Sequence, residues 1–429
     1  MKNISSTVLI LMLILPFMAG AQQQTHLFTG ARIIPIAGPE IDQGILVVRD
    51  GKIVDVGPAG EISVPDNAKV IDASGKVIMP GLVDSHSHIG EGDGGDRSSA
   101  LHPDVRILDA IDPQSDTFWK ALAGGITTVN VMPGSGHLMS GQTVYLKLRE
   151  ADAIEEMLFV DPDQGIAGGL KMANGTNPLG GGPFPGTRAK SAAMVRELFV
   201  KAVEYKRKLE DADGDREKMP KRDLGMETLV EVLEGKRIVH NHTHRHDDIL
   251  TAIRLSKEFG YRLVLHHVSE AWKVADEIAD ADVPCSIIVL DSPGGKLEAV
   301  DIRYENGVEL EKAGVTTGYH TDASITDTRL FLRSAAFGVR AGMSRPAALR
   351  AVTIANAKMM DVQNRVGTLE KGKDADFIIL SGDPLSVYTH VEQTWVEGRK
   401  RFDIDNPEDR KYATGGYEVF RGEFYDHHN

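Results

Sequence analysis

Two histidines near residue 87 are the first residues whose types and spacing indicate chemistry. His86 and His88 end the apolar run LVDSHSH and stand two residues apart, so an extended strand would present both imidazoles on one face. Two imidazoles on one face suit chelation of one metal ion. Because 15 histidines in 429 residues give roughly 0.5 His-x-His pairs by chance, the pair needs support from its surroundings.

That support comes from ionisable residues at the ends of later apolar runs. Lys171 lies in GGLKMANG, where an apolar strand would bury an unpaired ammonium unless it is modified or paired. His242 lies in VHNHTHRHDD, His267 in LVLHHVSE and Asp322 in GYHTDAS. Imidazole and carboxylate groups together suit Zn²⁺ or a similar divalent ion. The sequence therefore predicts a metal site at a set of strand ends.

Neighbouring histidines compete for two of these positions. In the run VHNHTH, His240, His242 and His244 share one face of a strand, and we select His242 because a helix is expected to begin near Asp247. In LVLHHV, inward alternation through Leu265 selects His267 over His266.

Three further polar residues are candidates for contact with substrate. These are Arg245 at a helix entrance, Asn174 in the turn after GGLKMA, and His320 on the inward face of the last strand. Arg245 would bind a substrate carboxylate, and the alternative is that it pairs only with Asp247 or Asp248. The remaining histidines near the strand ends are expected to be hydrogen-bonded neighbours: His137, His244, His246 and His266.

These candidate ligands can form one site only if the fold brings the ends of their strands together. From Gly81 to about Met360, short apolar runs alternate with longer helical stretches, including expected helices over 247–259 and 346–357 and a further strand over 151–160. This alternation predicts parallel β/α units. Eight units over about 280 residues fit an α/β fold of the (β/α)₈ TIM barrel type, which takes ~250 residues and gathers its active residues at the carboxyl ends of the strands.

Both ends of the chain are rich in β-type runs. Asp50 and Gly51 stand between two alternating apolar runs, which predicts a hairpin. Each end has too few strands to fold alone, so we expect one small β-sandwich domain built from both chain ends. The expected organisation is a signal peptide at 1–21, a first β-sandwich segment at 22–78, a TIM barrel with the predicted metal site at 79–360, a second β-sandwich segment at 361–402 and a C-terminal extension at 403–429.

Composition and the first residues limit compartment and partners. The apolar run 8–18 followed by small residues at 19–21 predicts a cleaved secretory signal, and hence a periplasmic or secreted protein with no membrane contact after cleavage. The net charge of −14 argues against nucleic acid as a partner. A single cysteine, Cys285, excludes an internal disulfide. The sequence leaves monomer and homo-oligomer both open.

Three segments carry a resemblance to a known family. VIMPGLVDSHSH, AGGITTVNVMPG and VGTLEKGKDADFIIL resemble the metal-dependent amidohydrolase superfamily, and GLKMANGTNP and HTHRHDDI are most similar to its imidazolonepropionase-like and prolidase-like branch. The resemblance implies two divalent ions per chain, Zn²⁺ or another metal. Their implied ligands are His86, His88, a carboxylated Lys171, His242, His267 and Asp322.

The implied reaction is hydrolysis of an amide C–N bond in a small molecule, a dipeptide or N-acyl amino acid. A hydroxide bridging the two metals would attack the carbonyl, and Asp322 would carry the proton to the leaving nitrogen. One alternative is a cyclic amide hydrolase, imidazolone hydrolase or deaminase with a single metal, which is disfavoured by Arg245, where such relatives often carry Glu, and by Lys171. An alternative of another class is a catalytically inactive binding protein.

Overall fold

The computed structural model describes residues 24–65, 67–92, 94–160, 165, 167–288, 296–323 and 325–416. The expected signal peptide at 1–21 and the end of the C-terminal extension lie outside the described residues. No helix in the described ranges has the length and apolar character needed to cross a membrane.

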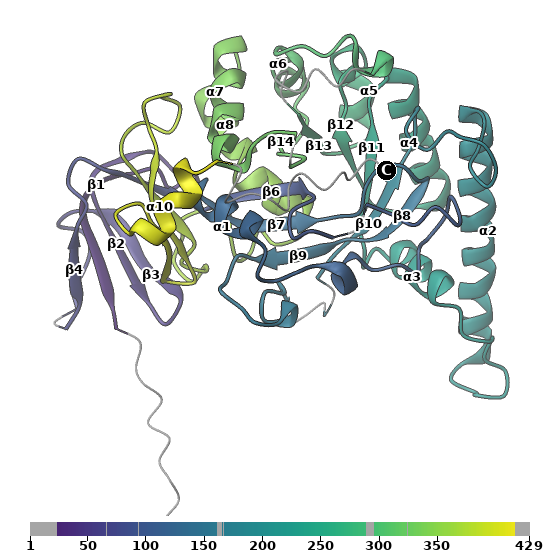
Figure 1. The fold of residues 1–429 in the computed structure, drawn as a ribbon, viewed down its shortest axis with the longest axis horizontal. Helices are drawn as coiled ribbons and strands as arrows, with labels where there is room; N and C mark the ends of the chain where they lie inside the picture. The colour runs from purple at the N-terminus through teal and green to yellow at the C-terminus, as the bar shows by residue number, and fades with distance from the viewer. Residues whose placement is uncertain are drawn as a thin grey trace, which may run out of the picture.

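Strands from both ends of the chain share one sheet, drawn in purple and yellow-green at the left of Figure 1. Its order is β17-β16-β15-β5-β1-β2-β3, with β4 beside β1. The predicted hairpin joins β2 to β3, and both turn residues have positive φ, 51° at Asp50 and 76° at Gly51, as a type I′ turn requires. The bounds are β1 His26–Ile33, β2 Ile41–Arg49, β3 Lys52–Pro58, β4 Lys69–Asp72, β5 Val77–Pro80, β15 Phe377–Leu380, β16 Val391–Val396 and β17 Arg399–Asp403.

An aromatic cluster holds the two ends of the chain together in this sheet. The ring of Phe28 lies 4.9 Å from that of Phe377 and 5.1 Å from that of Trp395, with the planes near perpendicular in both pairs. The shared sheet agrees with the expectation that both chain ends build one β-unit. Among the described residues, these strands form one hydrogen-bonded sheet, and the second sheet that a β-sandwich requires is not shown.

The middle of the chain forms two further sheets. One has the order β14-β13-β12-β11-β10-β8 and the other β6-β7-β9. Neighbours from β10 to β14 are parallel, as are β6 and β7. Within the described residues these ladders do not join into the closed eight-stranded barrel that we expected. The bounds are β6 Leu82–Ser87, β7 Ile126–Val131, β8 Met139–Gln142, β9 Val144–Lys147, β10 Leu170–Ala173, β11 Val239–Thr243, β12 Leu263–His267, β13 Cys285–Ile287 and β14 Thr317–Tyr319.

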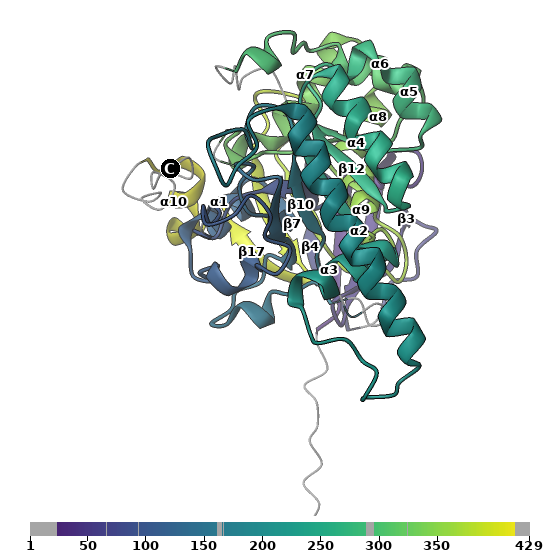
Figure 2. The same ribbon diagram turned by 90° about the vertical axis from the view of Figure 1, so that its right-hand side faces the viewer.

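Helices alternate with the parallel strands and cover the six-stranded sheet, and Figure 2 shows α2 and α4 side by side across it. Side-chain caps fix several helix starts: Thr187 accepts a hydrogen bond from the backbone N–H of Lys190, and Ser344 from that of Ala347. The bounds are α1 Asp116–Ala123, α2 Arg188–Ala212, α3 Leu224–Leu233, α4 His246–Phe259, α5 Ala275–Asp280, α6 Asn306–Lys312, α7 Phe331–Ala341, α8 Arg345–Ala351, α9 Ile354–Met359 and α10 Pro407–Thr414.

Two expected elements are different in the structure. The single helix predicted over 346–357 is two helices, α8 and α9, because the carbonyl of Val352 accepts a hydrogen bond from Val83 of β6 and Thr353 leaves the helical conformation. The strand predicted over 151–160 is a 3₁₀ turn at Ile154–Glu156 with an isolated bridge. The strands β8 and β9, which were not predicted, precede that turn.

A buried group of charges joins the small sheet to β9. The ammonium of Lys147 is fully buried and lies 2.6 Å from the carboxylate of Asp374 and 2.7 Å from that of Asp376, just before β15. Arg365 adds an ion pair to Asp374 at 2.7 Å. Four charges in a dry environment require one another, so this group fixes how the small sheet and β9 meet.

Candidate metal centre

The six residues that the sequence proposes as metal ligands lie at the carboxyl ends of the central strands. His86 is the second-last residue of β6 and His88 follows that strand, Lys171 lies in β10, His242 in β11, His267 in β12, and Asp322 follows β14. All of these side chains are buried except those of His88 and Asp322, which are partly exposed. The fold therefore brings residues that are up to 236 positions apart into one site.

The first group is formed by His86, His88 and Asp322. The carboxylate oxygen Oδ1 of Asp322 lies 3.3 Å from Nε2 of His86 and 3.1 Å from Nε2 of His88, and the two ring nitrogens are 3.3 Å apart. The other nitrogen of His88, Nδ1, lies 2.7 Å from the carbonyl oxygen of Met132. A ring whose Nδ1 donates to a carbonyl presents an unprotonated Nε2 to a metal.

Lys171 lies beside this first group. Its Nζ lies 3.0 Å from Nε2 of His86 and 3.0 Å from the sulfur of Met132, without a carboxylate within ion-pair distance among the described residues. Burial lowers the pKa of Lys171 to about 7, although the charge of Asp322 opposes this. A neutral amine is the form that reacts with an electrophile.

The second group lies on β11 and β12. His242, His244 and His267 offer ring nitrogens that are all within 4.8 Å of one another, and the rings of His242 and His267 are 4.3 Å apart. Nδ1 of His267 is also 3.9 Å from Asp322 and 3.3 Å from Nε2 of His320. His320 thus lies inside the cluster, stacked on His86 at 4.8 Å, and its Nδ1 is 2.8 Å from the hydroxyl of Ser286.

The side chains fit divalent metal ions by two criteria. Ring nitrogens at the centre are buried and lack a hydrogen-bond partner among the described residues, including Nδ1 of His242, Nε2 of His244 and Nε2 of His267. Burial also lowers the pKa values of His86, His242 and His267 well below the usual range, so these imidazoles are neutral, as metal ligands must be.

The charge of Asp322 completes the donor set. Burial by itself would raise the pKa of Asp322, but its interactions with the side chains of His88, His320 and Lys171 hold that pKa below its usual range. A carboxylate among neutral imidazoles is a combination that Zn²⁺ accepts.

Asp84 forms hydrogen bonds to two residues that belong to or adjoin the first donor group. Its carboxylate accepts hydrogen bonds from the backbone N–H of Thr321 at 3.1 Å, from the Thr321 hydroxyl at 2.5 Å and from the backbone N–H of His86 at 3.3 Å. Asp84 therefore links Thr321, the residue before Asp322, to the backbone of His86.

The alternation argument for β12 does not hold as stated. It places His266 and His267 on opposite faces, yet both rings lie 4.9 Å from that of His86. The cause is the backbone of His267, whose φ of 69° turns the end of the strand. His266 instead bonds through Nε2 to Nδ1 of His240 at 2.9 Å.

His244 lies in the second donor group, although the sequence did not lead us to propose it as a ligand. It was expected only as a hydrogen-bonded neighbour, and its Nδ1 does lie 2.8 Å from the hydroxyl of Ser269. Its other nitrogen, however, faces His242 and His267. The signal was present in the shared face of the His-x-His-x-His pattern.

Two of the expected substrate contacts are engaged elsewhere. Arg245 forms a two-point ion pair with Asp247, at 2.8 and 2.6 Å, and its side chain is 40% exposed. This is the alternative that the sequence left open. Asn174 donates to the carbonyl oxygen of Asp248 at 2.8 Å and lines a cavity of about 510 Å³ between the sheet and helices α2 and α4.

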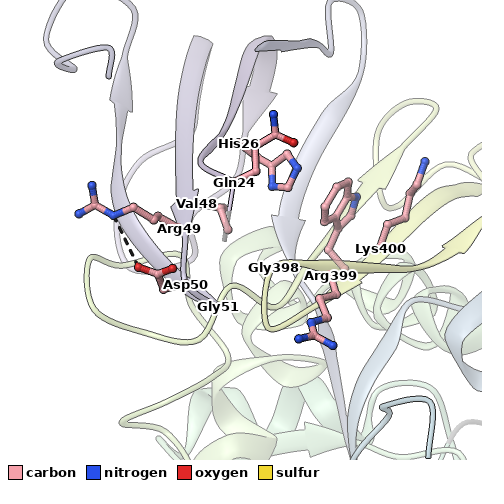
Figure 3. Close-up of a pocket in the computed structure, with 10 residues that line it drawn as sticks. Gln24, His26, Val48, Arg49, Asp50, Gly51, Gly398, Arg399 and Lys400 are labelled. Atoms are coloured by element: carbon pink, nitrogen blue, oxygen red, sulfur yellow. Dashed lines mark ion pairs between the residues drawn. The ribbon is translucent and has the colours of Figure 1, made fainter. Parts of the chain in front are cut away.

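A separate cavity of about 370 Å³ lies on the small sheet. Its wall includes the cations of Arg49, Arg399 and Lys400, but Figure 3 shows that their charged ends point in different directions. Arg49 pairs with Asp50 at 3.9 Å. This surface therefore lacks the convergent groups that the histidine cluster has.

Comparison with known proteins gives matches along most of the chain. The family model described as "Amidohydrolase family" matches residues 251–402. An amidohydrolase of known structure from Thermotoga maritima MSB8 is 34% identical and superposes with a TM-score of 0.82, covering 88% of this chain and 99% of that one.

Two curated relatives are more distant. The amidohydrolase tasK of Hapsidospora irregularis is 27% identical over 85% of this chain, which spans only 39% of the length of tasK. The imidazolonepropionase of Rhizobium rhizogenes is 26% identical over 84% of this chain and 93% of its own length.

Proposed function

We propose that this chain, which belongs to the amidohydrolase superfamily, is a metal-dependent hydrolase that cleaves the amide bond of a dipeptide or N-acyl amino acid. Membership brings with it hydrolysis of a C–N bond. The metal number, the substrate and the mechanism that follow are our proposal.

The observation that carries the proposal is the pair of donor groups at the strand ends, with Lys171 beside the first of them. His86, His88 and Asp322 form one group, the histidines of β11 and β12 form the other, and Lys171 lies 3.0 Å from a ring nitrogen of the first. The two groups approach each other where Nδ1 of His267 lies 3.9 Å from Asp322. Two adjacent donor groups, with the buried amine of Lys171 beside the first, favour two ions and a carboxylated Lys171 as a shared ligand. Divalent ions bound here would acidify water and polarise the substrate carbonyl.

Asp322 is the residue placed to move protons. Its carboxylate is ionised, lies within 3.3 Å of two ring nitrogens and is partly exposed to the site. It would accept a proton from the attacking water and return it to the leaving nitrogen, as a general base that becomes a general acid. Asp84, through Thr321, keeps that carboxylate in position.

A second candidate is opening of a cyclic amide by a site with one metal. The observation in its favour is the imidazolonepropionase relative that covers most of both chains. Lys171 has no evident role in a site with one ion, which makes this candidate weaker.

We also propose that the central strands close into a (β/α)₈ barrel and that the small sheet is part of a β-sandwich. Closure is supported by the backbone N–H of Asp322, after β14, which donates to the carbonyl oxygen of His86 at 3.0 Å. This bond links the end of the six-stranded sheet to the first strand of the three-stranded sheet. We also propose export through the signal at 1–21.

The test is a hydrolysis screen of dipeptides, N-acyl amino acids and cyclic imides with Zn²⁺-loaded protein. We expect turnover of linear amides that is lost in Asp322→Asn. His390→Gln, at an exposed histidine of the small sheet, should behave like the wild type and serves as the matched control. A fully metal-loaded protein that cleaves only cyclic substrates, or none, would contradict the proposal.

A further inference from the structure

Lys296 is a cation beside the loop that follows β10, in a segment held there by a buried glutamate. It directly precedes a 3₁₀ turn, Leu297–Ala299. Within that turn Glu298 is 3% exposed, and its Oε2 accepts a hydrogen bond from the backbone N–H of Thr176 at 2.7 Å. Thr176 belongs to the loop that follows β10, the strand that carries Lys171, so Glu298 fixes Lys296 beside that strand end.

The electrostatic neighbours of Lys296 come from several strand ends. Burial is the main reason for the low pKa values of His242, His244 and Lys171, and the charge of Lys296 lowers all three further. Burial lowers the pKa of Lys296, and the charges of Asp322 and Glu298 oppose that effect. These groups stand in β10, at the end of β11 and after β14, so the charge of Lys296 acts on the strand ends that carry the proposed ligands.

Lys296 has no carboxylate within ion-pair distance among the described residues, although the charges of Asp322 and Glu298 act on it. Its side chain is partly buried, yet no hydrogen bond or ion pair joins it to the rest of the described chain. The two arginines nearby differ in this respect, because Arg245 is paired with Asp247 and Arg188 with Asp248. A partly desolvated ammonium without a partner is unfavourable until an anion reaches it.

We infer that Lys296 is the residue that binds the negative group of the substrate, a carboxylate next to the scissile amide. The inference rests on the proposed function and makes its substrate class more specific. A carboxylate held by Lys296 would orient the amide toward Asp322, and the same ammonium would disfavour a substrate that carries a positive charge at that end. The role that the sequence suggested for Arg245 thereby passes to Lys296.

The first experiment compares kcat/KM for matched acids and amides, such as N-acetyl-L-leucine and N-acetyl-L-leucinamide and the corresponding dipeptide pairs, with the metal-loaded protein. We expect the wild type to prefer the acid, and Lys296→Met to lose that preference by about 10- to 100-fold through KM, as for a lost hydrogen bond to a charged group. Lys296→Arg should restore some of it. Arg245→Met is the matched control and should keep the preference.

A second experiment does not depend on turnover. Lys296 is reductively methylated in the metal-loaded protein, and its labelling is read by mass spectrometry with N-acetylglycine or N-acetylglycinamide present. We expect the acid, and not the amide, to protect Lys296.

The outcomes separate the inference from the proposed function. If amides are cleaved and the acid preference survives in Lys296→Met, the inference is wrong and the proposed function stands. If no amide is cleaved but N-acetylglycine alone protects Lys296, the proposed function is wrong and the anion site stands. Equal labelling of Lys296 with both probes overturns the inference in either case.

Discussion

Replacement of Lys147 by methionine should destabilise the protein far more than the same change at Lys52. Both ammonium groups pair with Asp374, at 2.6 Å from Lys147 and 2.5 Å from Lys52. Lys147 is fully buried, whereas the side chain of Lys52 is 48% exposed. Breaking a buried pair leaves an uncompensated charge and costs ~3–5 kcal/mol, while an exposed pair contributes ~0–1 kcal/mol.

The two carboxylates on Lys147 should respond differently to its loss. Burial raises the pKa of Asp376, whose ion pair is with Lys147. Burial would also raise the pKa of Asp374, but Lys147, Lys52 and Arg365 outweigh it and hold that pKa at about 2. In Lys147→Met, Asp374 keeps two cations whereas Asp376 loses the cation that it pairs with, so the main cost is an isolated Asp376 carboxylate.

This difference predicts how the variant depends on pH. Asp376 without Lys147 should have a folded pKa raised further above its unfolded value, so protonation removes the unfavourable charge at low pH. The stability deficit of Lys147→Met should therefore be largest near neutral pH and shrink as pH falls toward ~4, the usual pKa of Asp. In the wild type the depressed pKa of Asp374 gives the opposite sign: its contribution is present above ~4 and is lost as pH falls toward about 2.

The assay is guanidinium unfolding of metal-loaded wild type, Lys147→Met and Lys52→Met at neutral and mildly acidic pH. Equal midpoints for the two variants, or a deficit in Lys147→Met that grows on acidification, would refute the reasoning. A double variant with Asp376→Asn should recover some of the lost stability, because it removes the stranded charge.

Three further outcomes are expected. Asp322→Asn should fold, keep most of its metal and lose at least ~10²-fold in kcat, measured on the best substrate of the screen; near-normal turnover would assign the proton transfer to another group. Asp84→Ala removes the three hydrogen bonds that position Thr321 and His86, and should lower kcat more than it raises KM; an unchanged kcat would show that Asp84 does not position the site. Removal of the metals by a chelator should lower Tm in a scanning calorimeter, and Zn²⁺ should restore it, because a ligand of the folded state stabilises that state; an unchanged Tm would mean that the histidine cluster binds no metal.

Residue types near strand ends were enough to select side chains that lie close together in the structure, while their roles as ligands rest on the family resemblance. His86, His88, Lys171 and Asp322 were predicted because each ends an apolar run, and the structure brings them within hydrogen-bonding or ion-pair distances of one another. Strand ends are predictable because parallel neighbours in β/α units place them at one edge.

Features that depend on long-range contacts were not predictable from local pattern. The break between α8 and α9 arises because β6 takes the carbonyl of Val352, which lies far away in sequence. The inward turn of His267 needs a positive φ, which no residue type in LVLHHV signals. Lys296 could not be found either, since its place depends on Glu298 docking onto a loop 122 residues earlier.

The central claim is that two adjacent donor groups bind two metal ions with Lys171 as a shared ligand, and the metal content of the protein tests it most directly. Elemental analysis after dialysis should give close to two divalent ions per chain in the wild type. Lys171→Ala should lose metal and activity together, while His390→Gln should keep both. One ion per chain, with metal content and activity unchanged in Lys171→Ala, would contradict the account.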